Sequence, residues 1–184
     1  MGHPSDLPRL LGNAIQLGVV ASVDLDRATC TVRLGQIVTG DVPWLAGRAG
    51  GTSAWSPPTV GEQCLLLCPE GDIAAGVALL GLYSNAQPAP SAEADLDLIA
   101  FSDGATLRYD AAAHVLRAEL PEGARVEIEA PAGVLIVAPG GVRVDGSISA
   151  TDNLRAGNGA TGTFTTGTGG TVTVQGGIVT RIDG

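Results

Sequence analysis

Residues 121–141, PEGARVEIEAPAGVLIVAPGG, decide the fold class of this chain. Within this stretch residues 124–130 alternate strictly, with Ala, Val or Ile on one face and Arg125, Glu127 and Glu129 on the other. A repeat of two residues is the period of a β-strand that has one dry and one solvated face. The prolines and glycines at 131–133 and 139–141 then predict tight turns. The stretch therefore indicates short strands cut by turns.

The same turn signal recurs at intervals of eight to ten residues, beginning at residues 102–104, 111–113 and 121–123. A solenoid made by one chain needs roughly 20 residues per coil to enclose a core, so this chain cannot close around its own dry faces. Three identical chains can, because each supplies one wall of a prism. We therefore predict that residues 96–184 form an intertwined triple-stranded β-helix in a homotrimer. The residues predicted to face its core are Val126, Ile128, Val142, Val144 and Ile148.

The chain before this shaft has a different pattern. Residues 1–16 predict an N-terminal helical segment, with Pro8 in the first turn and Leu10, Leu11 and Ile15 on one side. Short β-rich runs follow at 18–25, 29–34, 63–67 and 76–83. Strands of this number and length predict an oligomer-binding (OB-fold) barrel over residues 17–85. Residues 86–95, rich in Pro, Ala and acids, predict a linker, so the protein is expected to be all-β.

Composition restricts the partners of the chain. Its 184 residues carry a net charge of −9, lysine is absent, and ten arginines are spread thinly along it. No basic patch is expected to hold a phosphate backbone, so no nucleic-acid partner is predicted. Cys30, Cys64 and Cys68 are an odd number without a CxxC pair, and we predict that they are small buried apolar residues. Neither a membrane span nor a signal peptide is expected.

Several polar and aromatic residues have a functional and a structural interpretation. In a trimer His114 would form a threefold ring able to bind an ion, although a place on the shaft or beside a turn is favoured. Trp44 and Trp55 are suited to stacking on a base or sugar, but packing between the barrel and a neighbouring protomer is favoured. The Glu127–Glu129 pair lies on a solvated face, which disfavours glycosidase chemistry. We predict no catalytic residue, no metal ligand and no cofactor.

Four segments together resemble a known family. They are residues 9–19, residues 42–50, the stretch WSPPTVGEQ at 55–63, and residues 71–84. In this order they are similar to the baseplate assembly protein V family, the central spikes of contractile-tail phages and of R-type pyocin-like bacteriocins. The barrel residues that carry the family motif are Trp44, Trp55, Pro57, Pro58, Gly61, Glu62 and Gln63.

The resemblance implies a structural, non-enzymatic spike at the baseplate tip that penetrates the bacterial outer membrane mechanically. Its expected partners are two further copies, the tail hub or tube protein, a possible separate tip protein and the target outer membrane. Such a spike is assembled in the host cytoplasm and becomes part of the baseplate of a released particle. Many family members end in a metal-binding His-x-His, whereas this chain has only His3 and His114.

Iron ligands therefore cannot be assigned by the resemblance, and an ion on the threefold axis remains open. Two other functions also remain open, the spike of a type VI-like secretion machine and, as a weaker alternative, an envelope-degrading tail enzyme. Phage and headless bacteriocin are equally compatible with the sequence.

Overall fold

The computed structural model describes residues 11–152, 154–155, 157 and 159–183. The chain divides into two compact units, Met1–Val126 and Glu127–Gly184. The first unit therefore holds both the barrel and the first strands of the region predicted as shaft. The domain limits proposed above, at residues 16, 85 and 95, stay predictions.

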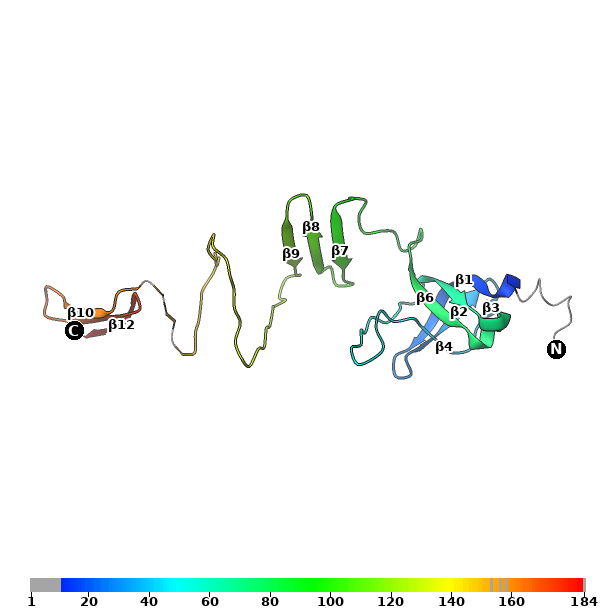
Figure 1. The fold of residues 1–184 in the computed structure, drawn as a ribbon, viewed down its shortest axis with the longest axis horizontal. Helices are drawn as coiled ribbons and strands as arrows, with labels where there is room; N and C mark the ends of the chain where they lie inside the picture. The colour runs from blue at the N-terminus through cyan, green and yellow to red at the C-terminus, as the bar shows by residue number, and fades with distance from the viewer. Residues whose placement is uncertain (1–10, 153, 156, 158, 184) are drawn as a thin grey trace. The chain divides into compact units, whose positions relative to one another are not determined.

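Strands close into a small barrel in the first unit (Figure 1). The sheet runs β3-β2-β1-β5-β6, and β4 pairs with β2. Immediately after β4, Trp44 makes a parallel bridge to Ala78 of β6, and the amide of Leu45 donates to the carbonyl oxygen of Ala78 at 2.8 Å. This contact joins the two ends of the sheet and closes the barrel. The strands are β1 (Ile15–Asp24), β2 (Thr29–Leu34), β3 (Ile37–Val38), β4 (Val42–Pro43), β5 (Gln63–Leu67) and β6 (Val77–Leu82).

β1 belongs to both walls of the barrel because it bends. Its first half pairs with β5 and its second half with β2, and the register shifts between Val20 and Ser22. A β-bulge of this kind increases the local twist and turns a strand around a corner. Gly18 permits the close approach on the inner side, since a β-carbon there would collide with the side chain of Val32.

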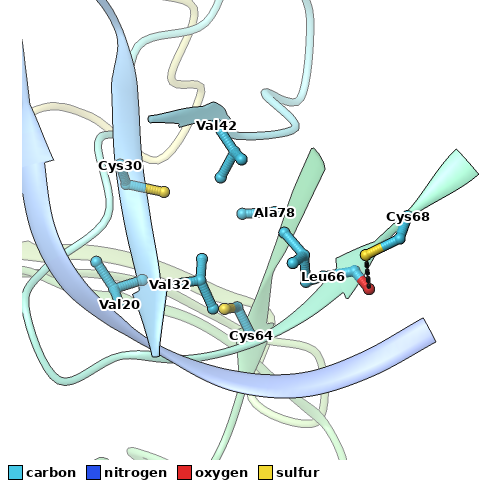
Figure 2. Packing of buried hydrophobic residues seen from close by; sticks show 8 residues of the cluster. All are labelled: Val20, Cys30, Val32, Val42, Cys64, Leu66, Cys68 and Ala78. Atoms are coloured by element: carbon cyan, nitrogen blue, oxygen red, sulfur yellow. Dashed lines mark hydrogen bonds between the residues drawn. The ribbon is translucent and has the colours of Figure 1, made fainter. Parts of the chain in front are cut away.

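The barrel core consists of small and branched side chains that alternate along each strand. Figure 2 shows these residues converging from β1, β2, β4, β5 and β6 and from the residue after β5. Leu66, Val20 and Val32 are completely buried. The three cysteines are free and buried, which confirms their predicted role as small core residues. The core residues are Val20, Cys30, Val32, Val42, Cys64, Leu66, Cys68 and Ala78.

The strands predicted at 29–34 and 63–67 have the predicted limits, and the other two are shifted by a few residues. Of the predicted N-terminal helix, residues 1–10 lie outside the described residues. Residues 11–13 are helical, and strand β1 already begins at Ile15. Two short 3-10 turns, η2 (Pro69–Gly71) and η3 (Ile73–Ala75), join β5 to β6. No strand occurs between β6 and residue 96, where the linker was predicted.

Beyond the linker, β7 (Leu96–Ala100), β8 (Thr106–Asp110) and β9 (Val115–Glu119) form an antiparallel meander (Figure 1). Strand β8 is hydrogen-bonded to β7 on one edge and to β9 on the other. This differs from the interleaved arrangement expected from the sequence, in which neighbouring strands come from other chains. The reason is that the turns at 102–104 and 111–114 return the chain directly alongside itself.

The second unit contains a separate meander near its end. It consists of β10 (Gly162–Thr165), β11 (Thr171–Gln175) and β12 (Ile178–Asp183), with β11 in the middle. Gly176 and Gly177, at φ 60° and 80°, form the two-residue turn between β11 and β12. Two successive left-handed residues are the requirement of a type I′ hairpin. Alternation in 171–174 and 178–182 is thus explained by strands that pair within the chain.

Candidate assembly surfaces

One face of the meander β7–β9 is mainly apolar, and it also carries Asp97, which lies opposite Tyr109. On the apolar face Ile99 lies opposite Leu107, and Tyr109 lies opposite Leu116. These four side chains are exposed, between 41% for Leu107 and 70% for Leu116. Because Tyr109 and Leu116 are directly opposed across a strand pair, they favour burial together. The apolar face therefore has the character of a contact surface.

The opposite face of the same meander is mixed, because its arginines lie among Leu96, Leu98 and Val115. Arg108 lies directly opposite Arg117, and both guanidinium groups approach the carboxylate of Glu119 at 3.5 Å. Exposed ion pairs of this kind add little stability, typically under about 1 kcal/mol. The single Glu119 carboxylate reduces the repulsion between the two arginines. Both faces thus mix apolar and charged side chains, and they differ in proportion.

Residues 120–150 carry all of the predicted shaft-core residues but contain no strand. Figure 1 accordingly shows no arrow between β9 and β10. Within one chain these side chains contact solvent. Their role in a trimer core stays a prediction. The exposed fractions are 71% for Val126, 73% for Ile128, 66% for Val142, 50% for Val144 and 64% for Ile148.

The predicted turns are present, and they share one backbone geometry. Gly104, His114, Gly123, Gly133 and Gly141 all have left-handed φ, between 56° and 108°. Their spacing of eight to ten residues is the one predicted from the sequence. In the last three turns an amide donates to the carbonyl oxygen three residues earlier, at 2.8 to 3.1 Å. His114 therefore lies in the β8–β9 turn, where its left-handed φ has a structural role.

The motif stretch WSPPTVGEQ forms the turn that leads into β5. The carboxylate of Glu62 accepts a hydrogen bond from the amide of Thr59 at 3.1 Å, and the Glu62 amide donates to the Thr59 carbonyl oxygen at 3.0 Å. Gly61 supplies the left-handed φ of 93° that this turn needs. Pro58 is buried and Pro57 is half-buried. Gln63 begins β5 and pairs with Val19 and Leu82. These motif residues therefore form the turn that fixes the start of β5.

Trp44 and Trp55 contact each other through their rings. Their ring centroids are 5.7 Å apart and the planes are tilted by 56°. Trp44 packs against the barrel core, whereas Trp55 is 62% exposed. Tilted aromatic pairs of this geometry contribute about 1 kcal/mol beyond the area they bury. The pair holds residues 44–55 against the barrel and leaves one indole face available for packing.

Sequence reasoning did not anticipate a shallow hollow of about 280 Å³ beside this loop. Its wall is mostly aliphatic, and it includes the carboxylate of Glu62, which Thr59 already engages. No group of three His, Cys, Asp or Glu side chains able to hold a metal ion occurs among the described residues. The lining residues are Leu45, Ala46, Gly47, Ala54, Ser56, Pro57, Glu62, Leu80 and Gly81.

Burial determines the chemistry of the cysteines. Desolvation, with a smaller contribution from the Cys30 and Glu62 charges, raises the pKa of the Cys64 thiol to about 11. Burial also raises the pKa of Cys30 and Cys68. The Cys68 thiol points back to the carbonyl oxygen of Leu66, 3.9 Å away (Figure 2). A raised pKa disfavours the reactive thiolate, so these residues are structural.

Residues 16–83 match the family model of the type VI secretion system/phage-baseplate injector OB domain. The barrel is therefore similar to the injector OB domain of this family. Its matched limits lie within two residues of the barrel predicted at 17–85. The part of the chain that the structure describes holds no helix long and apolar enough to cross a membrane.

The chain is also similar to the spike protein of Escherichia phage P2, with 37% identity over 110 residues. This alignment covers 60% of the chain and 52% of the relative, so the chain spans about half the length of the relative. The two matches confirm the predicted resemblance to baseplate spikes. A barrel that matches the injector OB domain, followed by β-strands, is therefore the architecture that the structure and the matches support.

Proposed function

We propose that the chain is one protomer of a homotrimeric, cell-puncturing spike at the baseplate tip of a contractile phage tail or phage-tail-like bacteriocin. The injector OB domain docks on the tail hub or tube protein, and the shaft points at the target outer membrane. Sheath contraction supplies the work, so the chain contributes stiffness and shape and no catalysis. The particle is assembled in the host cytoplasm and carries the spike in its baseplate.

One observation carries this proposal. Residues 124–130 and 142–150 place aliphatic side chains on one face, yet those side chains are at least half exposed in the single chain. Burying an aliphatic side chain of this size contributes about 1.5 to 3 kcal/mol, so the face favours association. Three chains around one axis bury it while each keeps its charged face in water. Closed threefold symmetry also limits the oligomer to three chains.

The partners and cofactors of the spike follow from the same arrangement. No cofactor is required for mechanical penetration, and the tip is completed either by the chain itself or by a separate tip protein. An ion on the threefold axis is compatible with the proposal and is not needed by it. Nucleic acid is not a partner.

The proposal is tested with particles that carry Ile128→Asp or, as a matched control, Glu129→Lys. Aspartate at 128 places three charges at one level of the dry core, whereas lysine at 129 lies on the solvated face. We expect Glu129→Lys particles to contract and release potassium from target cells, and Ile128→Asp particles to lack this activity. Equal activity of the two particles would contradict the proposal.

A second candidate is the spike of a type VI secretion machine, because the matched domain family includes both systems. Neighbouring genes distinguish the two, since phage or bacteriocin loci encode tail fibres and lysis proteins. An envelope-degrading enzyme is the third candidate. Release of sugar or peptide fragments from purified peptidoglycan by the isolated chain would favour it over the mechanical spike.

A further inference from the structure

Two adjacent parts of the chain differ in whether their residues pair as strands within the chain. In residues 96–119 the middle strand β8 is paired on both edges within the chain. In residues 120–150 the described backbone makes turns but no strand pairs. Both parts nevertheless have β-forming residues between turns that are spaced eight to ten residues apart. The two parts therefore differ in whether a neighbouring strand is available within the chain, and not in the β-propensity of their residues.

The first part has the local contacts needed to fold alone. At the β7–β8 turn the amide of Gly104 donates to the carbonyl oxygen of Phe101 at 3.1 Å, and the amide of Ala105 donates to the Asp103 carboxylate at 3.0 Å. At the β8–β9 turn the amide of Ala113 donates to the Asp110 carboxylate at 2.8 Å. Each turn is thus fixed by an aspartate close in sequence. Hairpins with such local contacts form within about 1 to 10 μs.

The second part has no partner strand within the described chain, and its apolar side chains are exposed. Val134, Leu135, Ile136 and Val137 are four successive aliphatic residues, and each is 61% to 87% exposed. Four in a row place apolar groups on both faces of an extended chain. An extended run without a neighbouring strand has no intrinsic stability in water. Pairing with other chains would supply the neighbour that this part needs.

A rival arrangement within one chain exists. The turn in which the Ala124 amide donates to the carbonyl oxygen of Pro121 at 3.1 Å follows directly after β9, which is an edge strand of the meander. A fourth strand, formed by residues 125–130, could therefore add to β9 without a second chain. The structure does not contain that strand.

We propose that this chain assembles in two stages: the meander of residues 96–119 folds first within each chain, and residues 120–150 acquire strand structure only as three chains combine. This inference rests on the proposed homotrimer and specifies how it forms. The meander gives each chain a strand edge and the exposed Tyr109–Leu116 pair before the chains meet. The following segment then pairs with other chains, so that its folding and the assembly are one event.

Pulse-labelling hydrogen exchange during refolding of the full chain from urea tests this order, with light scattering recorded in parallel. We expect protection of β8 amides at a rate independent of protein concentration. We expect protection of residues 124–150 to accelerate at least tenfold when the concentration is raised tenfold, in step with the trimer signal. In Ile128→Asp, β8 should still be protected and residues 124–150 should remain unprotected.

Each other result has a distinct meaning. Protection of both parts at one concentration-dependent rate, with trimer formed, would overturn the two-stage order and leave the trimer intact. Protection of residues 124–150 before any trimer signal would show the fourth strand within one chain and would also overturn the inference. If the molecular mass from light scattering stays at that of one chain throughout refolding, both the proposed function and this inference are overturned. The Glu129→Lys chain serves as the control and should refold like the unmodified protein.

Discussion

Val20 and Glu62 are joined backbone to backbone, because the amide of Val20 donates to the carbonyl oxygen of Glu62 at 2.8 Å. The neighbouring amide of Gly61 donates to the carbonyl oxygen of Val20 at 2.9 Å. These two bonds fix the motif turn to the bent part of β1 and set the register of β5. The turn at residues 59–62 depends on Gly61, which has a left-handed φ.

Replacing Gly61 by alanine should destabilise the injector OB domain by about 1 to 2 kcal/mol, the cost of a left-handed φ in a residue with a β-carbon. Trp44 and Trp55 are the two tryptophans of the chain, so their fluorescence during urea unfolding reports the barrel alone. Gly47→Ala is the matched control, since a β-carbon at Gly47 meets nothing within 4 Å. Equal stability of the two variants would show that the turn does not fix the barrel.

Thr29→Val should stabilise the barrel by about 1 kcal/mol. The Thr29 hydroxyl is buried and has no hydrogen-bond partner among the described residues, so valine removes an unsatisfied group at similar volume. Thr31→Val on the same strand is the control, because the Thr31 hydroxyl lies 2.7 Å from that of Ser22. We expect Thr31→Val to be neutral or slightly destabilising in the same urea titration. A loss of stability in Thr29→Val would mean that its hydroxyl is satisfied in solution.

Barrel stability should fall as the pH rises from about 9 toward 11. The Cys64 thiol has its pKa raised to about 11 in the folded barrel, whereas in the unfolded chain it ionises near the ordinary thiol pKa of 9.0. Its contribution to stability is therefore complete below pH 9 and is lost through the window up to the folded pKa. Above pH 9 one thiol lowers the free energy of unfolding by at most about 1.4 kcal/mol per pH unit.

Cys64→Ala provides the control for this pH dependence. The variant should be less stable at pH 7, because it leaves a small cavity, but its stability should fall less steeply between pH 9 and pH 11. Urea midpoints from tryptophan fluorescence at both ends of the window measure this slope. The same slope in both proteins would exclude Cys64 as its source.

Alternation and turn residues in the sequence predicted where strands lie better than they predicted which strands pair. Residues 29–34 and 63–67 gave the limits of β2 and β5, since turn residues bound both runs. The two-residue strands β3 and β4 could not be predicted, because only the neighbouring β2 defines them. In residues 124–130 the dry face was evident, but a strand also requires a hydrogen-bonded neighbour. The residues of the segment itself do not tell which strand will be that neighbour.

The candidate surfaces were also hard to predict, because they depend on contacts between segments. The apolar face of β7–β9 could be recognised only once the register placed Tyr109 opposite Leu116. The hollow beside Glu62 was not predictable, because it depends on how the loop 45–57 packs on β6. For the meander β10–β12 the signal was present, since the Gly176–Gly177 pair is typical of a two-residue hairpin. Trp44 and Trp55 were expected to pack between the barrel and a neighbouring protomer, and that stays a prediction, since the contact in the structure joins the two tryptophans of one chain.

Val126→Asp should prevent assembly, because three buried carboxylates at one level cost several kcal/mol each unless neutralised. Glu129→Lys should assemble normally, since residue 129 lies on the solvated face. Size-exclusion chromatography of both purified variants measures the outcome. Identical elution of the two would mean that residues 126 and 129 do not face different environments.

The mass of the purified chain in native buffer tests the central claim most directly. Multi-angle light scattering over a hundredfold range of concentration should give three times the chain mass of 18.4 kDa, about 55 kDa, without intermediate species. This expectation rests on the aliphatic side chains Val126, Ile128 and Val142, which are 66% to 73% exposed in the single chain. A constant mass of 18.4 kDa at every concentration would contradict the homotrimeric spike.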